Sequence, residues 1–193
     1  MHEALYNWGN ALSDQAKTRD GAEADSLYEL AARKYEAALG IKPDYHHALN
    51  NWGAVLYSQA IAKKGDEADR LFELAGRKYE AALKIKPDKH EALINWGNAL
   101  LGQAKTKQGA EADSLFELAV EKLLEVESLS RGSGAYNLAC LNALRGDEKE
   151  CRKWLEKSRD FGWLPSREHM EQDTDLDNVR ECQWFQDLLA SQQ

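Results

Sequence analysis

The chain has 193 residues, of which 43% are hydrophobic and 30% are charged, a composition typical of a folded globular protein with a core. Its formal net charge of −8 disfavours nonspecific attraction to nucleic acid or to an acidic membrane surface. No apolar run approaches the roughly 20 residues of a membrane span, and the start "MHEALYNWGN" lacks the pattern of a secretory signal. We therefore expect a cytoplasmic protein with neither a nucleic-acid nor a membrane partner.

The sequence shows no set of residues suited to catalysis or metal binding. It has no Gly-rich phosphate loop, and "HEALI" at 90–94 lacks the second histidine of a zinc protease motif. Cys140, Cys151 and Cys182 share no C-x-x-C spacing and lack a matched histidine pair, so reduced thiols are favoured over a zinc site. We expect a protein that is not an enzyme and that has no metal site and no cofactor.

A period of 44 residues organises most of the chain. "NWGNAL" at 7–12 returns at 95–100 and appears as "NWGAVL" at 51–56, and the segments 2–45, 46–89 and 90–133 align without drift. Repeats of this length usually form units that bury their apolar faces by stacking on their neighbours.

Each repeat is predicted to form two amphipathic helices, because its apolar residues fall at helical spacing. The first stripe of repeat one is Leu5, Trp8, Leu12 and Ala16, and the second is Leu27, Leu30, Ala31, Tyr35 and Ala38. Gly21, Gly65 and Gly109 mark the break between the helices, where a glycine with positive φ would close the first helix. Pro43 and Pro87 mark the next break, with Asp44 and Asp88 as candidate caps of the following helix.

The unit resembles the tetratricopeptide repeat (TPR). The matching residues are Leu5, Trp8, Gly9, Leu12, Ala31, Tyr35, Ala38 and Pro43, with their counterparts 44 residues later. An ordinary TPR has ~34 residues, so about ten are added in each unit. We expect these to lengthen both helices and predict a second helix from about Ala22 to Ile41.

The resemblance implies an all-α fold, a right-handed TPR-type α-solenoid of antiparallel helix pairs. We expect one domain over 1–193, with units at 2–45, 46–89, 90–132 and 133–164, the last of ordinary length. Residues 165–193 would form a C-terminal capping segment. Its closing helix would follow an N-cap at Thr174 and carry one stripe, Leu176, Val179, Phe185 and Leu189.

Trp8, Trp52 and Trp96 recur at one position of the unit, and we expect them to be buried packing residues rather than a ligand cage. Gly9, Gly53 and Gly97 follow them because the helices approach too closely for a side chain, despite the ~1 kcal/mol that glycine costs within a helix.

The concave wall of a TPR solenoid is lined by first helices, so the resemblance places a peptide-binding groove there. The candidate groove residues are Tyr6, Asn7, Asn10, His47, Asn51, Tyr57, Glu91, Asn95, Asn98 and Asn137. Asn7, Asn51, Asn95 and Asn137 would form a ladder that binds peptide groups, or would instead bond neighbouring helices. Some TPR grooves clamp acidic tails with cations, but those cations are missing here, so a neutral or basic partner segment is favoured.

The leading hypothesis is a noncatalytic protein–protein interaction scaffold that binds a peptide or helical segment of a partner protein. The alternative is a self-assembling homo-oligomer that uses an uncapped N-terminal face, because repeat one has no preceding helix in this sequence. A third reading is that the chain is a piece of a longer protein.

Overall fold

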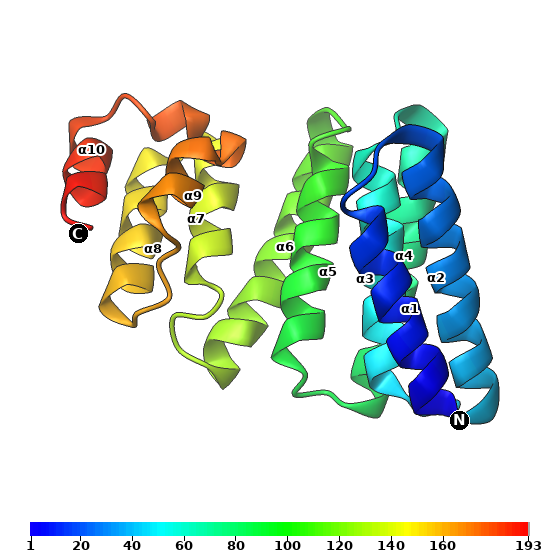
Figure 1. Cartoon of the computed structure of the whole chain (residues 1–193). Helices are drawn as coiled ribbons and strands as arrows, with labels where there is room; N and C mark the ends of the chain where they lie inside the picture. The colour runs from blue at the N-terminus through cyan, green and yellow to red at the C-terminus, as the bar shows by residue number, and fades with distance from the viewer. Residues whose placement is uncertain (193) are drawn as a thin grey trace. The chain divides into compact units, whose positions relative to one another are not determined.

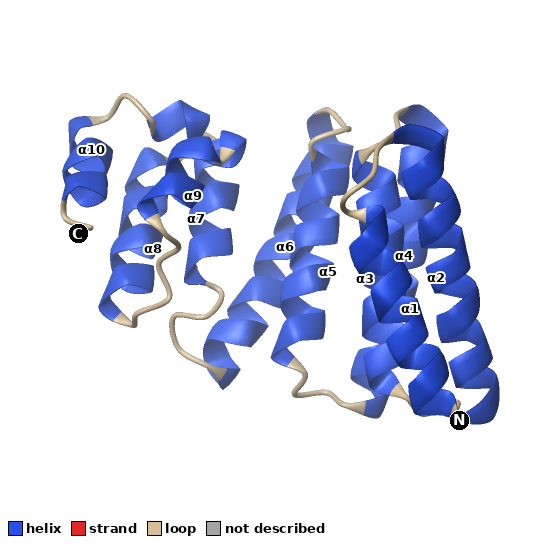
Figure 2. Ribbon diagram, in the orientation of Figure 1, coloured by secondary structure: helices blue, strands red, loops and turns tan. Residues whose placement is uncertain are grey.

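The computed structural model describes residues 1–192, and every regular element in that range is a helix (Figure 2). Contacts divide the chain into two compact units, one over Met1–Leu115 and one from Phe116 onward. Successive helix pairs pack against each other, as in an α-solenoid, and this confirms the predicted fold class.

The first unit is built from long helices. These are α1 (His2–Ala16), α2 (Gly21–Ile41), α3 (His46–Ile61), α4 (Gly65–Ile85), α5 (His90–Ala104) and the start of α6 (Gly109–Leu129). Helices α1 and α2 lie side by side and run in opposite directions (Figure 1). Each helix from α1 to α5 contacts the next, and the first helices α1, α3 and α5 also contact each other in that order.

The added length of the repeats lies in both of their helices. Helices α1, α3 and α5 have 15 or 16 residues, and α2, α4 and α6 each have 21. In the shorter pair of the second unit, α7 (Ala135–Leu144) has 10 residues and α8 (Glu148–Asp160) has 13. The predicted helix from about Ala22 to Ile41 is therefore present, one residue longer at its start.

The turns differ from the sequence prediction in two ways. Gly21, Gly65 and Gly109 do adopt positive φ, at 57°, 60° and 59°, but each is the first residue of the second helix rather than the end of the first. The predicted caps Asp44 and Asp88 are wrong. The N-cap residues of α3 and α5 are the next residues, Tyr45 and Lys89, and neither makes a side-chain cap bond.

Two glycines allow close contact between paired helices, as expected. A Cβ atom added to Gly9 would lie 2.6 Å from the Tyr35 ring, and one added to Gly53 would lie 2.6 Å from the Tyr79 ring. Both tyrosines are fully buried. The aromatic ring of the second helix therefore occupies the space that a side chain on the first helix would need.

The prediction that the repeated tryptophans pack in the core is wrong for Trp8 but holds in part for Trp52 and Trp96, which pack against core residues. Trp8 is 54% exposed, and Trp52 and Trp96 are half-buried. The Lys34 Nζ lies 3.7 Å from the centre of the Trp8 ring, and the Lys78 Nζ lies 3.3 Å from that of Trp52. In both pairs the lysine comes from the second helix of the same repeat. Each lysine forms a cation–π contact with the tryptophan ring at the protein surface.

The second unit continues from the end of α6 through α7 and α8 to a tail of short helices. The tail contains α9 (Arg167–Gln172), a 3₁₀ helix η1 (Thr174–Val179) and α10 (Gln183–Ala190). The closing stripe is therefore divided between η1 and α10 rather than carried by one helix. The predicted N-cap Thr174 is also wrong, because the Asp173 side chain accepts the Asp175 N–H at 2.9 Å.

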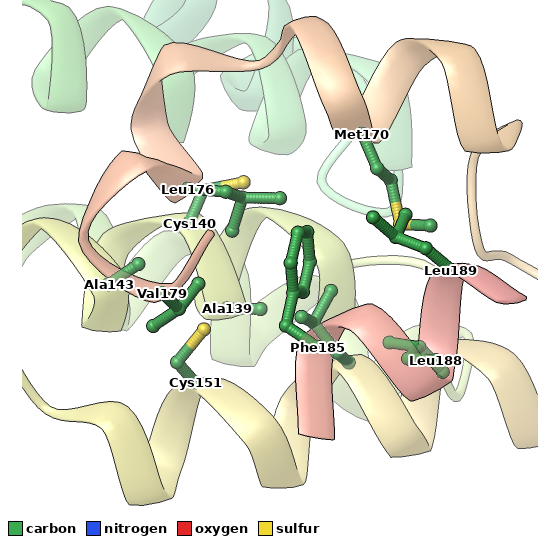
Figure 3. Close-up of a cluster of buried hydrophobic side chains, with 11 residues drawn as sticks. Ala139, Cys140, Ala143, Cys151, Met170, Leu176, Val179, Phe185, Leu188 and Leu189 are labelled. Atoms are coloured by element: carbon green, nitrogen blue, oxygen red, sulfur yellow. The ribbon is translucent and has the colours of Figure 1, made fainter. Parts of the chain in front are cut away.

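The tail closes the core of the second unit. Leu176, Val179, Phe185 and Leu189 are all buried, so the residues of the predicted stripe do face the core. Figure 3 shows Phe185 of α10 between residues of α7, α8, α9 and η1. The tail thus covers α7 and α8 with apolar side chains.

A buried carboxylate holds the end of α6. The two Glu127 oxygens accept the backbone N–H groups of Gly132 and Gly134 at 3.0 and 2.8 Å, and the Lys157 Nζ of α8 lies 2.6 Å away. Burial alone raises the pKa of Glu127, but these donors outweigh it and hold the pKa below its ordinary value. The side chain therefore ties the α6–α7 turn to α8.

Candidate functional site

The row of first helices carries nine of the ten predicted groove residues. Tyr6, Asn7 and Asn10 lie on α1; His47, Asn51 and Tyr57 lie on α3; and Glu91, Asn95 and Asn98 lie on α5. Asn137 lies on α7 in the second unit. The first unit therefore presents nine of the candidates on three neighbouring helices.

A polar hollow opens on this row of helices, with a volume of about 340 Å³. Its lining consists of Asn10, Ser13, Asp14, Lys17, Tyr35, Asn51, Ala54, Ser58 and Glu91. Three of the ten predicted residues, Asn10, Asn51 and Glu91, meet in this one hollow. Its charged lining residues are two acids and one lysine, so the hollow has a small negative charge.

Beyond the ten predicted residues, the polar lining of this hollow includes Ser13, Asp14, Lys17, Tyr35 and Ser58. Tyr35 fits the apolar stripe of α2, but its hydroxyl extends past the core to donate to Asn10 Oδ1 at 2.8 Å. Lys17 pairs with Asp14 at 2.8 Å. The i, i+3 spacing of opposite charges at the end of α1 was the available signal for this pair.

Asn10 and Asn51 join α1 to α3. The Asn51 Nδ2 donates to Asn10 Oδ1 at 2.9 Å and to the Tyr6 hydroxyl at 3.0 Å. Burial is the main cause that raises the pKa of Tyr35 above its ordinary value, so its hydroxyl keeps its proton and remains a donor.

Asn50 extends this chain of amides to α5. It is almost fully buried, donates to Asn51 Oδ1 at 3.1 Å, and accepts from the Asn95 Nδ2 at 3.3 Å. Asn51 and Asn95 therefore bond neighbouring helices, as the alternative interpretation of the asparagine ladder proposed. Asn7, the equivalent residue of repeat one, is exposed and does not line the hollow.

Aromatic rings gather near the start of α1 and α3. Tyr6 contacts Tyr45 with ring centres 5.2 Å apart, and Tyr45 contacts His47 at 5.7 Å. Partial desolvation of the ring and then the nearby Lys89 lower the pKa of His47, although Glu91 opposes this. His47 is thus a neutral, exposed ring beside Tyr6 at neutral pH. Tyr57 instead packs beside Phe72 of α4, with ring centres 6.1 Å apart.

A second, more apolar hollow of about 280 Å³ lies between α4 and α5. Phe72, Trp96 and Leu100 contribute its apolar side chains, and Glu73 and Glu80 are among its charged ones. None of the ten predicted residues lines it. This hollow is a distinct alternative location for a ligand in the first unit.

Neither a metal cluster nor a membrane-spanning helix is found in residues 1–192. No three His, Cys, Asp or Glu side chains in that range are placed to hold a metal ion. None of its helices has both the length and the apolar character that crossing a bilayer requires. Cys140, Cys151 and Cys182 are free, and the first two are buried.

Comparison with known families gives a match over part of the chain. Residues 47–138, just under half of the chain, match the model of the family described as plant specific mitochondrial import receptor subunit TOM20. The matched range contains α4, α5, α6 and nearly all of α3, so it includes two of the three first helices in the row described above. No curated protein matches the chain.

This match corrects one prediction. The cytoplasmic location expected from composition is wrong, because the matching family is a subunit of a mitochondrial import receptor. Composition and net charge could not reveal this, because neither property identifies the organelle in which a protein works.

Proposed function

We propose that the protein is a noncatalytic receptor that works at the mitochondrion and binds a targeting segment of precursor proteins. The observation that carries this proposal is the family match over residues 47–138. A receptor function agrees with the helical repeats, which offer a long row of first helices as a binding surface.

The charge of the chain and of the hollow supports a basic ligand. Mitochondrial targeting segments are amphipathic, rich in Arg and Ser, and poor in acidic residues. The chain has a net charge of −8, and Asp14 and Glu91 line the polar hollow. Complementary charge would speed the encounter and favour basic over acidic segments. The TPR-type groove on α1, α3 and α5 is the binding surface in this proposal.

The proposal is tested with a fluorescently labelled, Arg-rich amphipathic peptide taken from the start of a mitochondrial precursor. The binding affinity is measured by fluorescence anisotropy with wild-type protein and with Ser58→Lys, which places a cation in the hollow. We expect Ser58→Lys to weaken binding by about tenfold, because like charges repel at short range.

Ser26→Lys is the matched control, because Ser26 is exposed on α2 and lies outside the hollow. It changes the net charge equally and should alter the affinity by less than about twofold, since a distant surface charge is screened by salt. If the wild-type protein does not bind the peptide, the receptor proposal is wrong. Equal binding by the two variants would instead move the site elsewhere, for example to the hollow between α4 and α5.

A second candidate function, association of two copies, is favoured by the exposed face of α1. This face consists of Ala4, Asn7, Trp8, Ala11 and Gln15. The residues 44 positions later are all buried or half-buried, among them Ala48 and Val55, which pack into the core formed with α2. The helices of repeat one cover the equivalent face of α3. We therefore propose that a second copy of the chain covers the exposed face of α1.

Light scattering across a concentration series tests this second candidate. The wild-type mass should rise toward that of a dimer with concentration, and Trp8→Glu should remain monomeric because it places a charge on the face. A wild-type mass that stays monomeric at every concentration contradicts self-association.

A further inference from the structure

Three polar groups of the hollow make no hydrogen bond within residues 1–192. They are the Asn10 amide nitrogen and the hydroxyls of Ser13 and Ser58, and they come from two helices, α1 and α3. All three residues are half-buried, so the groups face the open space of the hollow rather than a dry interior. They are available to a ligand in a hollow of about 340 Å³.

The orientation of the Asn10 amide is fixed by its neighbours. Its Oδ1 accepts from the Tyr35 hydroxyl at 2.8 Å and from the Asn51 Nδ2 at 2.9 Å. A carbonyl oxygen has two lone pairs, so these two donors use its full capacity. Turning the amide over would place its N–H₂ against the Asn51 Nδ2, which has no lone pair to accept a hydrogen bond. The N–H₂ group therefore keeps its two hydrogens directed away from Tyr35 and Asn51.

The donors to Asn10 are themselves held in place. Tyr35 is fully buried, and its ring fills the space beside Gly9. The Asn51 Nδ2 uses one hydrogen for Tyr6 and one for Asn10, while its Oδ1 accepts from the buried Asn50. Every polar atom of Asn51 is thus engaged within the protein. Asn10 is the member of this amide chain that retains donors for a ligand.

We propose that Asn10 donates a hydrogen bond to a main-chain carbonyl oxygen of the bound segment, and that Tyr35 and Asn51 are positioning residues for this donor. This inference rests on the proposed receptor function and names what the hollow recognises. Targeting segments share composition and amphipathicity, but their side chains at any one position differ. A main-chain carbonyl is present at every residue, so a fixed amide donor suits a receptor that accepts many sequences.

The test compares Asn10→Asp with Ala54→Asp, using two labelled precursor peptides of unrelated sequence. Aspartate at position 10 keeps an oxygen for Tyr35 and Asn51 but removes the N–H₂ donors. Ala54→Asp adds the same charge to the lining of the same hollow without removing a hydrogen-bonding side chain. Relative to Ala54→Asp, we expect Asn10→Asp to weaken binding of both peptides by about three- to tenfold, the effect of one hydrogen bond.

The outcomes separate this inference from the receptor proposal. If the wild-type protein binds both peptides and the two variants bind them equally, the donor role of Asn10 is wrong and the receptor proposal stands. A loss for one peptide alone would show side-chain recognition and contradict the main-chain proposal. Failure of the wild-type protein to bind either peptide contradicts the receptor proposal itself. Melting temperatures of both variants confirm that each is folded.

A double-mutant cycle tests the positioning role of Tyr35. Tyr35→Phe removes one donor to Asn10 Oδ1 with little change of shape, so it should weaken peptide binding in the wild-type background. In the Asn10→Asp background it should have no further effect on affinity, because the oriented donor is already absent. Equal losses in both backgrounds would show a merely structural role and overturn the assignment.

Discussion

At the scale of single residues, equivalent residues of the repeats differ in burial and in hydrogen bonding from one repeat to the next. Trp8 is exposed and contacts a lysine, whereas Trp52, at the equivalent position of the next helix pair, is half-buried. Asn7 is exposed, but Asn51 bonds two neighbouring groups on α1. The difference arises because α3 packs against the helices of repeat one, whereas the same face of α1 is exposed.

Gly53→Ala should destabilise the first unit. The new Cβ would meet the buried Tyr79 ring at 2.6 Å, and overpacking of this kind costs about 1–3 kcal/mol, more than the roughly 1 kcal/mol gained in helix propensity. Urea unfolding followed by circular dichroism measures the change.

Gly40→Ala is the matched control for this prediction. Gly40 is exposed near the end of α2, and an added Cβ would meet nothing within 4 Å. It should stabilise the protein by up to about 1 kcal/mol, because alanine favours the helix. Equal stabilisation by both substitutions would show that the Tyr79 ring can move aside, contrary to the prediction.

At the scale of elements, the second unit depends on polar anchors as well as on its apolar core. Glu127 joins the end of α6, the following turn and α8 through three contacts, made with the backbone N–H groups of Gly132 and Gly134 and with the Lys157 Nζ. Asp173 accepts the Tyr136 hydroxyl at 2.7 Å and also caps η1. These carboxylates fix turns that the apolar pattern alone does not specify.

Glu127→Gln should lower the free energy of unfolding by about 1–3 kcal/mol, because it removes a charge-assisted bond to Lys157 and turns one acceptor into a donor facing a backbone N–H. Glu125→Gln, at an exposed residue on the same helix, should change it by less than about 0.5 kcal/mol. Chemical denaturation at neutral pH measures both, and equal effects would refute the anchoring role.

The same anchor predicts a pH dependence. The pKa of Glu127 is lowered in the folded state, so its contribution to stability is fully present above the ordinary value of 4.5. That contribution is lost as the pH falls through the lower, folded-state pKa. The stability difference between wild type and Glu127→Gln should therefore shrink in acid. A difference that stays constant down to low pH would contradict the ionised anchor.

At the scale of the whole molecule, net charge and the repeated helix pairs bear on the choice of partner. A chain with a net charge of −8 attracts basic segments over a range set by the Debye length. Affinity for the Arg-rich precursor peptide should therefore fall as the ionic strength rises from about 0.03 M to about 0.3 M, over which the Debye length shrinks about threefold. Anisotropy titrations measure this, and Ser58→Lys should show a weaker salt dependence. An affinity that does not change with salt would exclude charge as a source of selectivity.

Much of the local structure followed from the sequence by itself. The 44-residue period, the helical spacing of apolar residues and the glycine breaks predicted α1 to α6 and their added length, because periodicity and backbone freedom are properties of neighbouring residues. The close approach at Gly9 and Gly53 was also predictable, since a glycine inside a helix needs a packing reason.

Only the tertiary structure decided which repeated side chains are buried and which polar atoms remain available to a ligand. The exposure of Trp8 depends on what packs against α1, and the donor direction of Asn10 depends on Tyr35, 25 residues away, and on Asn51, 41 residues away. The burial of a side chain and the number of its hydrogen bonds depend on partners that are distant in sequence. A repeated motif has the same residues whether or not such partners are present.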